Sequence, residues 1–252
     1  MSKKEHKIPE LLDMMQAGVH FGHTTSRWHP KMEQYIYAVR QGIHIIDLEQ
    51  TAKRLEQALD FLFDTVASGK SVLWIGTKKQ GRDIVRKYAS ETQSPYVVDK
   101  WLGGTFTNFD TIQNLIKKLE KLEEERDQGK HEKYTKKEQL EFQREIDRLT
   151  YLVGGIRTMK TLPGAVFMID LKEDKTPRLE AHTKKVPVVG VVDTNINPTG
   201  IEYPVPGNDD AVRSLELFCS CVAHTINEAQ AVYAKKQAES AQKADKPNKP
   251  KK

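Results

Sequence analysis

The residues that most clearly suggest a ligand-binding or reactive site lie in the segment VLWIGTKKQGRD, residues 72–83. A phosphate-binding loop of nucleotide hydrolases reads G-x-x-x-x-G-K-[ST] after a buried strand, and Gly76 and Gly81 have this spacing. The lysine of that loop contacts the terminal phosphates, and the following hydroxyl binds magnesium. Here Arg82 and Asp83 stand at those places, and a carboxylate cannot replace the hydroxyl. The sequence therefore disfavours nucleotide hydrolysis at this loop.

The same turn is suited to a phosphate of a nucleic-acid backbone. A turn from strand to helix presents backbone N–H groups, and Lys78, Lys79 and Arg82 add positive charge beside them. The alternative is an exposed loop whose lysines are only solvated. No G-x-G-x-x-G follows a predicted strand, so we do not expect a dinucleotide site.

A second segment, HFGHTTSRWHPKM at residues 20–32, combines cations with aromatic rings. Rings interleaved with cations can stack on unpaired bases and neutralise phosphates in RNA. Trp28 with Arg27 and Lys31 would supply both functions. The alternative is a loop whose aromatic residues pack on the core while its polar atoms form turns.

Two groups of residues could bind a metal ion. His20 and His23 lie close in sequence but lack further ligands at zinc-finger spacing. The segment DTNINPTGIEYPVPGNDDA places Asp193, Asp209 and Asp210 at the expected carboxyl ends of strands, the usual ligand edge of an open parallel sheet. These carboxylates could hold magnesium or act as acid and base. Turn formation and helix capping explain the same residues without a ligand.

A third segment, KWLGGTFTNFDT, places Gly103 and Gly104 after Trp101. Paired glycines allow close approach of another backbone, because they carry no side chain. That backbone could belong to this chain or to a nucleic acid, and the sequence leaves both options open.

The helical and apolar segments around these motifs predict an α/β fold. Short apolar runs, SVLWIG, YVV, AVFMID and VPVVGVVD, alternate with helical segments, which predicts a parallel sheet with helices on both faces. The spacing of Leu55, Leu59, Leu62 and Val66 predicts a helix over about residues 51–68. Upstream of it, YIYAVRQGIHIID predicts two strands around a turn.

An insertion of different character spans residues 108–152. Ile112, Leu115, Leu119 and Leu122 recur at helical spacing, and a second such run follows a turn near Gly129. Two antiparallel coiled-coil helices satisfy this pattern. A hairpin of this kind buries little against the main core, so we expect it to reach a partner. The alternative is an ordinary helix pair packed on the surface.

The chain has 252 residues and a formal net charge of +5, but the charge is not evenly spread. From residue 235 onward, seven lysines face two acidic residues, which leaves the rest of the chain neutral. Any nucleic-acid surface must then come from local segregation of charge. The tail is rich in Lys and Pro, and we expect it to be disordered, as a solvated terminus or a nonspecific polyanion contact.

Composition also bounds the class of protein. The sequence has no apolar run long enough to span a bilayer and no leader typical of secretion, so we expect no membrane partner. Cys219 and Cys221 lie in one predicted helix and suit a reducing compartment. We divide the chain into an α/β domain with an N-terminal extension (residues 1–107 and 153–234), the hairpin (108–152) and the basic tail (235–252).

Five motifs, in order and in spacing, resemble the bacterial small-subunit ribosomal protein S2 family. They are AGVHFGHTTSRWHPKM, GIHIIDLEQT, VLWIGTKKQ, WLGGTFTNF and VPVVGVVDTNINPTGIEYPVPGNDDAVRS, and the resemblance runs from about Ile8 to Glu228. It implies a flavodoxin-like or Rossmann-like α/β domain with an inserted coiled-coil hairpin. It also implies no catalytic activity, no cofactor, no metal and no small-molecule substrate.

The resemblance further implies a place on the cytoplasmic ribosome. Its partners would be 16S rRNA and neighbouring small-subunit proteins, including the large flexible one that captures mRNA. With Arg82 added from the loop argument, the RNA-facing residues would be His23, Arg27, Trp28, Lys31, Lys78, Lys79, Gln80, Arg82, Trp101, Gly103 and Gly104. The chain departs from the family's usual pattern at Gly164, at Arg178 and in LFCSCVAHTI, which puts the packing of its last two helices in question. The alternative to this reading is a nucleotide-dependent enzyme built on the same sheet.

Overall fold

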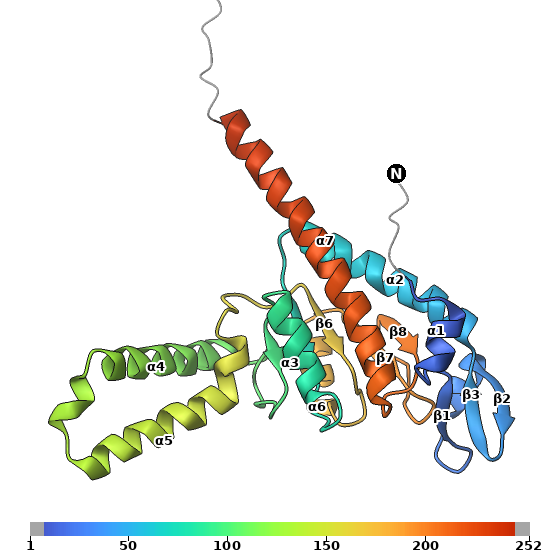
Figure 1. Ribbon diagram of the computed structural model, residues 1–252, viewed down its shortest axis with the longest axis horizontal. Helices are drawn as coiled ribbons and strands as arrows, with labels where there is room; N and C mark the ends of the chain where they lie inside the picture. The colour runs from blue at the N-terminus through green and yellow to red at the C-terminus, as the bar shows by residue number, and fades with distance from the viewer. Residues whose placement is uncertain (1–7, 245–252) are drawn as a thin grey trace, which may run out of the picture.

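A five-stranded parallel sheet forms the centre of the molecule (Figure 1). The computed structural model describes residues 8–244, with side chains up to residue 238. The strands run in the order β5-β4-β6-β7-β8. Their bounds are Val72–Ile75 for β4, Tyr96–Val97 for β5, Ala165–Met168 for β6, Val188–Val192 for β7 and Tyr203–Pro206 for β8. The predicted parallel α/β sheet is confirmed.

Helices cover both faces of this sheet because its strands are apolar on both sides. In β4, Val72 and Trp74 pack into one hydrophobic cluster, while Leu73 and Ile75 pack into another. The first cluster is completed by α2 (Leu48–Ala67), α3 (Arg82–Glu91) and α7 (Val212–Ala244). The second is completed by α6 (Lys175–Thr183) and by the base of the helical insertion. The predicted apolar face of α2 is buried in the first cluster.

The N-terminal part adds α1 (Leu11–Gln16) and a small antiparallel sheet beside the main one (Figure 1). Its strands are β1 (Phe21–Thr24), β2 (Ile36–Arg40) and β3 (Ile43–Ile46), with the 3-10 helix η1 (Pro30–Tyr35) before β2. The turn between β2 and β3 falls at Gln41 and Gly42, whose φ angles are 51° and 76°. Two positive φ angles are what a two-residue hairpin turn requires. The predicted turn is confirmed.

The insertion consists of α4 (Phe109–Asp127) and α5 (Lys136–Val153), which run antiparallel and project away from the sheet (Figure 1). The 3-10 helices η2 (Lys130–Lys133) and η3 (Gly154–Ile156) lie at its tip and its base. Buried leucine and isoleucine side chains near the base join both helices to the second cluster. The antiparallel helix pair is thus present, while its coiled-coil geometry and the division into domains remain predictions.

The last helix differs from the prediction at its end. We expected disorder from residue 235, but α7 continues to Ala244. The segment AKKQAESAQKA is rich in Ala, Lys, Gln and Glu, which have high helix propensity, and this outweighs its low hydrophobicity. Residues 245–252, the rest of the predicted tail, lie outside the described residues. Among those that are described, no helix combines the length and apolarity needed to cross a membrane.

The two glycines of the phosphate-loop-like segment have a packing role. A Cβ on Gly76 would lie 2.7 Å from Cδ1 of Ile169, and a Cβ on Gly81 would collide with the same atom. Ile169 is fully buried just after β6, so it has little room to move. The spacing of the glycines therefore follows from the close approach of the β4–α3 turn to β6, and no phosphate is needed to explain it.

We expect Gly81→Ala to lower the free energy of unfolding by roughly 1–3 kcal/mol, because the added methyl group overpacks the turn against Ile169. Ile169→Val removes the atom that the methyl group would meet. The double variant should therefore lose less stability than the sum of the two single variants in denaturant unfolding. Additive losses would show that the turn is not limited by this contact.

Candidate functional site at the carboxyl edge of the sheet

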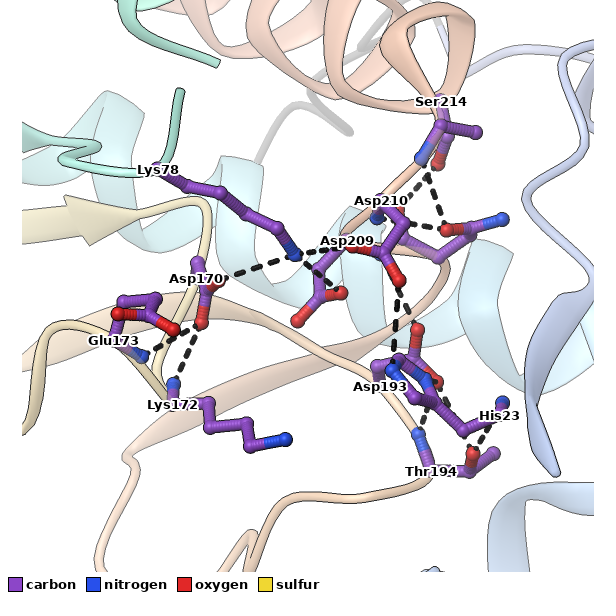
Figure 2. Close-up of polar contacts among 12 residues, drawn as sticks. His23, Lys78, Asp170, Lys172, Glu173, Asp193, Thr194, Asp209, Asp210 and Ser214 are labelled. Atoms are coloured by element: carbon purple, nitrogen blue, oxygen red, sulfur yellow. Dashed lines mark hydrogen bonds and ion pairs between the residues drawn. The ribbon is translucent and has the colours of Figure 1, made fainter. Parts of the chain in front are cut away.

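Charged side chains converge at the carboxyl ends of four adjacent parallel strands (Figure 2). Lys78 follows β4, Asp170 follows β6, Asp193 follows β7, and Asp209 follows β8. Parallel strands bring these ends to one edge, so residues far apart in sequence become neighbours. We call this group, together with Asp210 and His23, the acidic cluster.

The ammonium of Lys78 lies at the centre of the acidic cluster. Its Nζ is 2.6 Å from Asp210 Oδ1, 3.0 Å from Asp209 Oδ1 and 3.2 Å from Asp170 Oδ2. Burial alone would lower the pKa of Lys78, but its hydrogen bond to Asp210 and the charges of Asp209 and Asp170 outweigh burial and raise that pKa. Lys78 is therefore a cation held inside the protein by three carboxylates.

This arrangement argues against the expectation that Lys78 offers its charge to an RNA phosphate. Only 14% of its side chain is exposed, and its donors already face acceptors. Moving the ammonium to a phosphate would leave Asp170 and Asp209, each 2% exposed, as uncompensated buried charges. That exchange would therefore carry an energetic cost.

His23 contacts two carboxylates of the acidic cluster. Its Nδ1 is 3.0 Å from Asp193 Oδ1, and its Nε2 is 3.5 Å from Asp210 Oδ2. The hydrogen bond to Asp193 raises the pKa of His23 against the opposing effect of burial. The backbone N–H of His23 also donates to Thr194 Oγ1 at 2.8 Å. The segment that begins at His23 is thereby fixed to the end of β7.

Within the described residues, one group has the composition and spacing to hold a metal ion. It consists of His23, Asp193 and Asp209, whose ligand atoms all lie within 4.8 Å of one another. Imidazole and carboxylate groups are ordinary ligands of divalent cations. Burial and repulsion from Asp193 and Asp170 raise the pKa of Asp209, so extra positive charge would favour its ionised form. The ammonium of Lys78 supplies part of that charge.

Hydrogen-bond donors in the turn between β4 and α3 are satisfied by a further carboxylate. Asp174 accepts hydrogen bonds from Thr77 Oγ1 at 2.8 Å and from the Thr77 N–H at 3.4 Å. Arg82 Nε donates to the Thr77 carbonyl at 2.8 Å, so this guanidinium also serves the turn. Lys79 and Gln80 are exposed. Of the predicted cations in this turn, only Lys79 points its charge to solvent without an ion pair in the described structure.

The glycine-rich turn after β5 surrounds the carboxylate of Glu180. Backbone N–H groups of Gly104, Phe106 and Thr107 donate to it at 2.8, 2.9 and 3.2 Å. The indole N–H of Trp101 donates at 3.1 Å. Gly104 has a φ of 94°, which favours glycine, and Glu180 accepts from its N–H without using the space that a side chain would fill. Gly103 is different, because a Cβ placed there would meet nothing within 4 Å.

The remaining predicted residues lie in the loop between β1 and η1 and in the first turn of η1. Arg27 is exposed and has no ion pair in the part of the chain that the structure describes. Lys31 is exposed and donates to Thr199 Oγ1 at 2.8 Å. Trp28 is 37% exposed, and its ring centroid is 5.1 Å from that of the buried His44. One side of the indole thus packs on the protein while part of the ring stays accessible.

Three functional residues were missed in the sequence: Asp170, Asp174 and Glu180. All three are almost fully buried, yet the sequence alone shows them as ordinary acids in a charged stretch, IDLKEDKTPRLEA. The available signal was that Asp170 directly follows an apolar strand, at the edge where Asp193 was already expected. Their distant partners are Lys78 for Asp170, Thr77 for Asp174 and the backbone of residues 104–107 for Glu180. All of these lie 73 or more residues away in the chain, so spacing could not reveal them.

Comparisons with known proteins agree on one family. A family model described as ribosomal protein S2 matches residues 14–229. The small ribosomal subunit protein uS2 of Campylobacter concisus is 45% identical over 222 residues, which cover 88% of this chain and 85% of the relative. That of Desulforapulum autotrophicum is 46% identical over 227 residues, with 90% and 81% covered. That of Treponema pallidum strain Nichols is 45% identical over 222 residues, with 88% and 76% covered.

Adjacent lysines in the β4–α3 turn offer a matched test of the acidic cluster. We expect Lys78→Met to lower the free energy of unfolding by about 2–4 kcal/mol, because it leaves buried carboxylates unpaired. Lys79→Met should change it by less than about 0.5 kcal/mol, because the side chain is exposed. Denaturant unfolding at neutral pH measures both. Equal effects of the two variants would show that Lys78 is not a structural counter-ion.

Asp174 predicts a pH dependence of stability. Burial raises the pKa of its carboxyl from 3.8 to about 6. The folded state therefore holds the proton more tightly than the unfolded state, and this contribution is full below pH 3.8 and lost as the pH rises through about 6. Asp174→Asn has no such titration, so the wild type should lose roughly 2–3 kcal/mol relative to it across this range. If the free energies of unfolding of the two proteins differ by a constant amount from about pH 4 to 7, the assignment is wrong.

Proposed function

The chain belongs to the ribosomal protein S2 family, and from this premise we propose that it binds 16S rRNA through exposed cations on two loops fixed to the acidic cluster. Members of this family are structural, non-enzymatic components of the ribosome. The chain is accordingly a constituent of the small ribosomal subunit in translation, and it works on the cytoplasmic ribosome. Its partners are those of the ribosome, namely rRNA and other subunit proteins.

The observation that carries the RNA proposal is the contrast between paired and unpaired cations at the carboxyl edge. Lys78 is held by three carboxylates, whereas Arg27 and Lys79 are exposed and have no ion pair in the described structure. Both loops are anchored to the acidic cluster, one through His23 and the other through Lys78. Cations on loops that are fixed in place can bind backbone phosphates with a small loss of conformational entropy.

Other predicted residues receive more specific roles in this proposal. Trp28 offers the exposed part of its ring for stacking on an unpaired base. Lys31 and Arg82 contribute positive charge from positions already fixed by hydrogen bonds to Thr199 and Thr77. Trp101 acts on the structure of its turn, since its indole N–H is donated to Glu180. Gly103 provides a bare backbone at which the RNA can approach closely.

We extend the proposal to protein partners on two grounds. The family resemblance supports a part in docking the large ribosomal protein that captures mRNA, for which we assign no surface. The α4–α5 insertion projects from the sheet, and its tip helix η2 has no buried residue, which suits an element that reaches a neighbouring molecule (Figure 1). The nucleotide-dependent enzyme is not retained, because Ile169 explains the glycine spacing of its loop and the acidic cluster explains Lys78.

The cation proposal predicts a change in salt dependence. Arg27→Gln and Lys79→Gln should each weaken binding to 16S rRNA and reduce the slope of log affinity against log salt by about 1, because each removes one phosphate contact. Lys53→Gln, an exposed lysine on α2, should change neither quantity. Filter binding or fluorescence anisotropy over a salt series measures the slopes. Wild-type slopes in both loop variants would remove these loops from the RNA surface.

The two adjacent glycines give a second matched test. Gly103→Ala should leave the free energy of unfolding within about 0.5 kcal/mol of wild type, since the site is open, but weaken rRNA binding by crowding the RNA backbone. Gly104→Ala should lower the free energy of unfolding by about 1 kcal/mol or more, because Gly104 has a φ of 94°. If Gly103→Ala binds rRNA as the wild type does, close approach at this position is wrong.

A further inference from the structure

The turn between β5 and α4 has the geometry of an anion-binding site. Its backbone N–H groups at Gly104, Phe106 and Thr107 point at one place, and the Trp101 indole N–H and Thr107 Oγ1 point there as well. Successive N–H groups that converge on one point form a concavity that binds phosphates and other anions. We call residues 101–107 the nest.

The nest is occupied by the carboxylate of Glu180, which is 8% exposed. Its Oε1 accepts from Gly104 and Trp101, and its Oε2 accepts from Phe106 and Thr107. Burial alone would raise the pKa of this carboxyl, but hydrogen bonds donated by Gly104 and Phe106 outweigh burial and lower it. Glu180 is therefore the ionised ligand of a site built by another segment of the same chain.

Glu180 also links α6 to the nest and to the start of α4. It lies on α6, whereas the nest leads directly into α4 through the turn in which the Asn108 N–H donates to the Gly104 carbonyl at 2.8 Å. The ring of Phe106 is fully buried and meets Trp101 edge-on, with 5.0 Å between ring centroids. The carboxylate thus fixes the backbone that carries Gly103 and the point at which the insertion leaves the sheet.

We propose that Glu180 is a positioning residue for rRNA binding: its carboxylate fills the nest of residues 101–107 and so fixes Gly103 and the base of α4. The effect on RNA rests on the proposed function above, while the occupancy of the nest does not. The nest N–H groups are consumed by Glu180, so RNA meets the outer, Gly103 side of this turn.

Glu180→Ala tests the proposal, because it deletes the carboxylate and one methylene group and leaves a space of the size of acetate. In the full chain, amide exchange at Gly104, Phe106 and Thr107 should speed up by about tenfold or more, and the Trp101 indole N–H resonance should shift. Affinity for 16S rRNA should fall about tenfold. Acetate, but not chloride at the same ionic strength, should restore both the amide protection and the affinity.

Glu173→Ala is the matched control, since Glu173 is exposed just before α6. It should behave as the wild type in all these measurements. If Glu180→Ala does not fold, Glu180→Gln takes its place, because the amide keeps the shape but offers one acceptor oxygen instead of two. Partial loss of protection and of rRNA affinity is then expected.

The outcomes separate the two parts of the proposal. Wild-type amide protection in a folded Glu180 variant would overturn the occupancy of the nest. Lost protection with unchanged rRNA affinity would overturn the positioning role, as would acetate that restores protection but not affinity. If the wild type itself does not bind rRNA, the proposed function fails and the positioning role with it, and the exchange data still decide the occupancy of the nest.

Discussion

Charge compensation at the carboxyl edge of the parallel sheet holds the turns of this protein in place. Turns that lead from strands into helices present N–H groups and cations at that edge, and other proteins use such turns to bind anions from solution. This chain meets the requirement with its own carboxylates. Asp174 accepts hydrogen bonds from the turn after β4, and Glu180 accepts them from the turn after β5. The carboxylates of the acidic cluster surround Lys78. Each pairing joins segments that are distant in sequence.

Internal compensation has a consequence for binding. A turn whose donors are already satisfied has one conformation, so it can present its remaining groups without first becoming ordered. His23 holds the N-terminal loop in the same way, because its contacts to Asp193 and Asp210 fix the segment that leads to Arg27. In the proposed function, the buried carboxylates therefore support the RNA surface indirectly. We propose that they position the cations, the bare backbone at Gly103 and the exposed part of Trp28 without contacting the RNA themselves.

The sequence was sufficient for features that depend on local pattern. Apolar runs between helices predicted the parallel sheet, and helical spacing predicted α2 and the helix pair of the insertion. It was insufficient where the explanation lies across the fold. In the sequence, Lys78 has the features of a residue free to contact a phosphate, because its partner Asp209 lies 131 residues away. Gly103 and Gly104 likewise do not indicate the carboxylate of Glu180 that binds this turn. Charge counts treat a buried carboxylate and an exposed one alike, so only the structure distinguishes them.

Lys78 is an internal counter-ion in the free protein, and we propose that it remains one when RNA is bound. NMR of the lysine side-chain ammonium groups measures this directly, through the proton exchange rate and the chemical shift of the Lys78 Nζ. We expect a slowly exchanging ammonium signal for Lys78, held by the contacts to Asp209 and Asp210, that keeps its position when 16S rRNA is added. A Lys78 ammonium that exchanges as fast as an exposed lysine, or that shifts on RNA binding, would contradict this expectation.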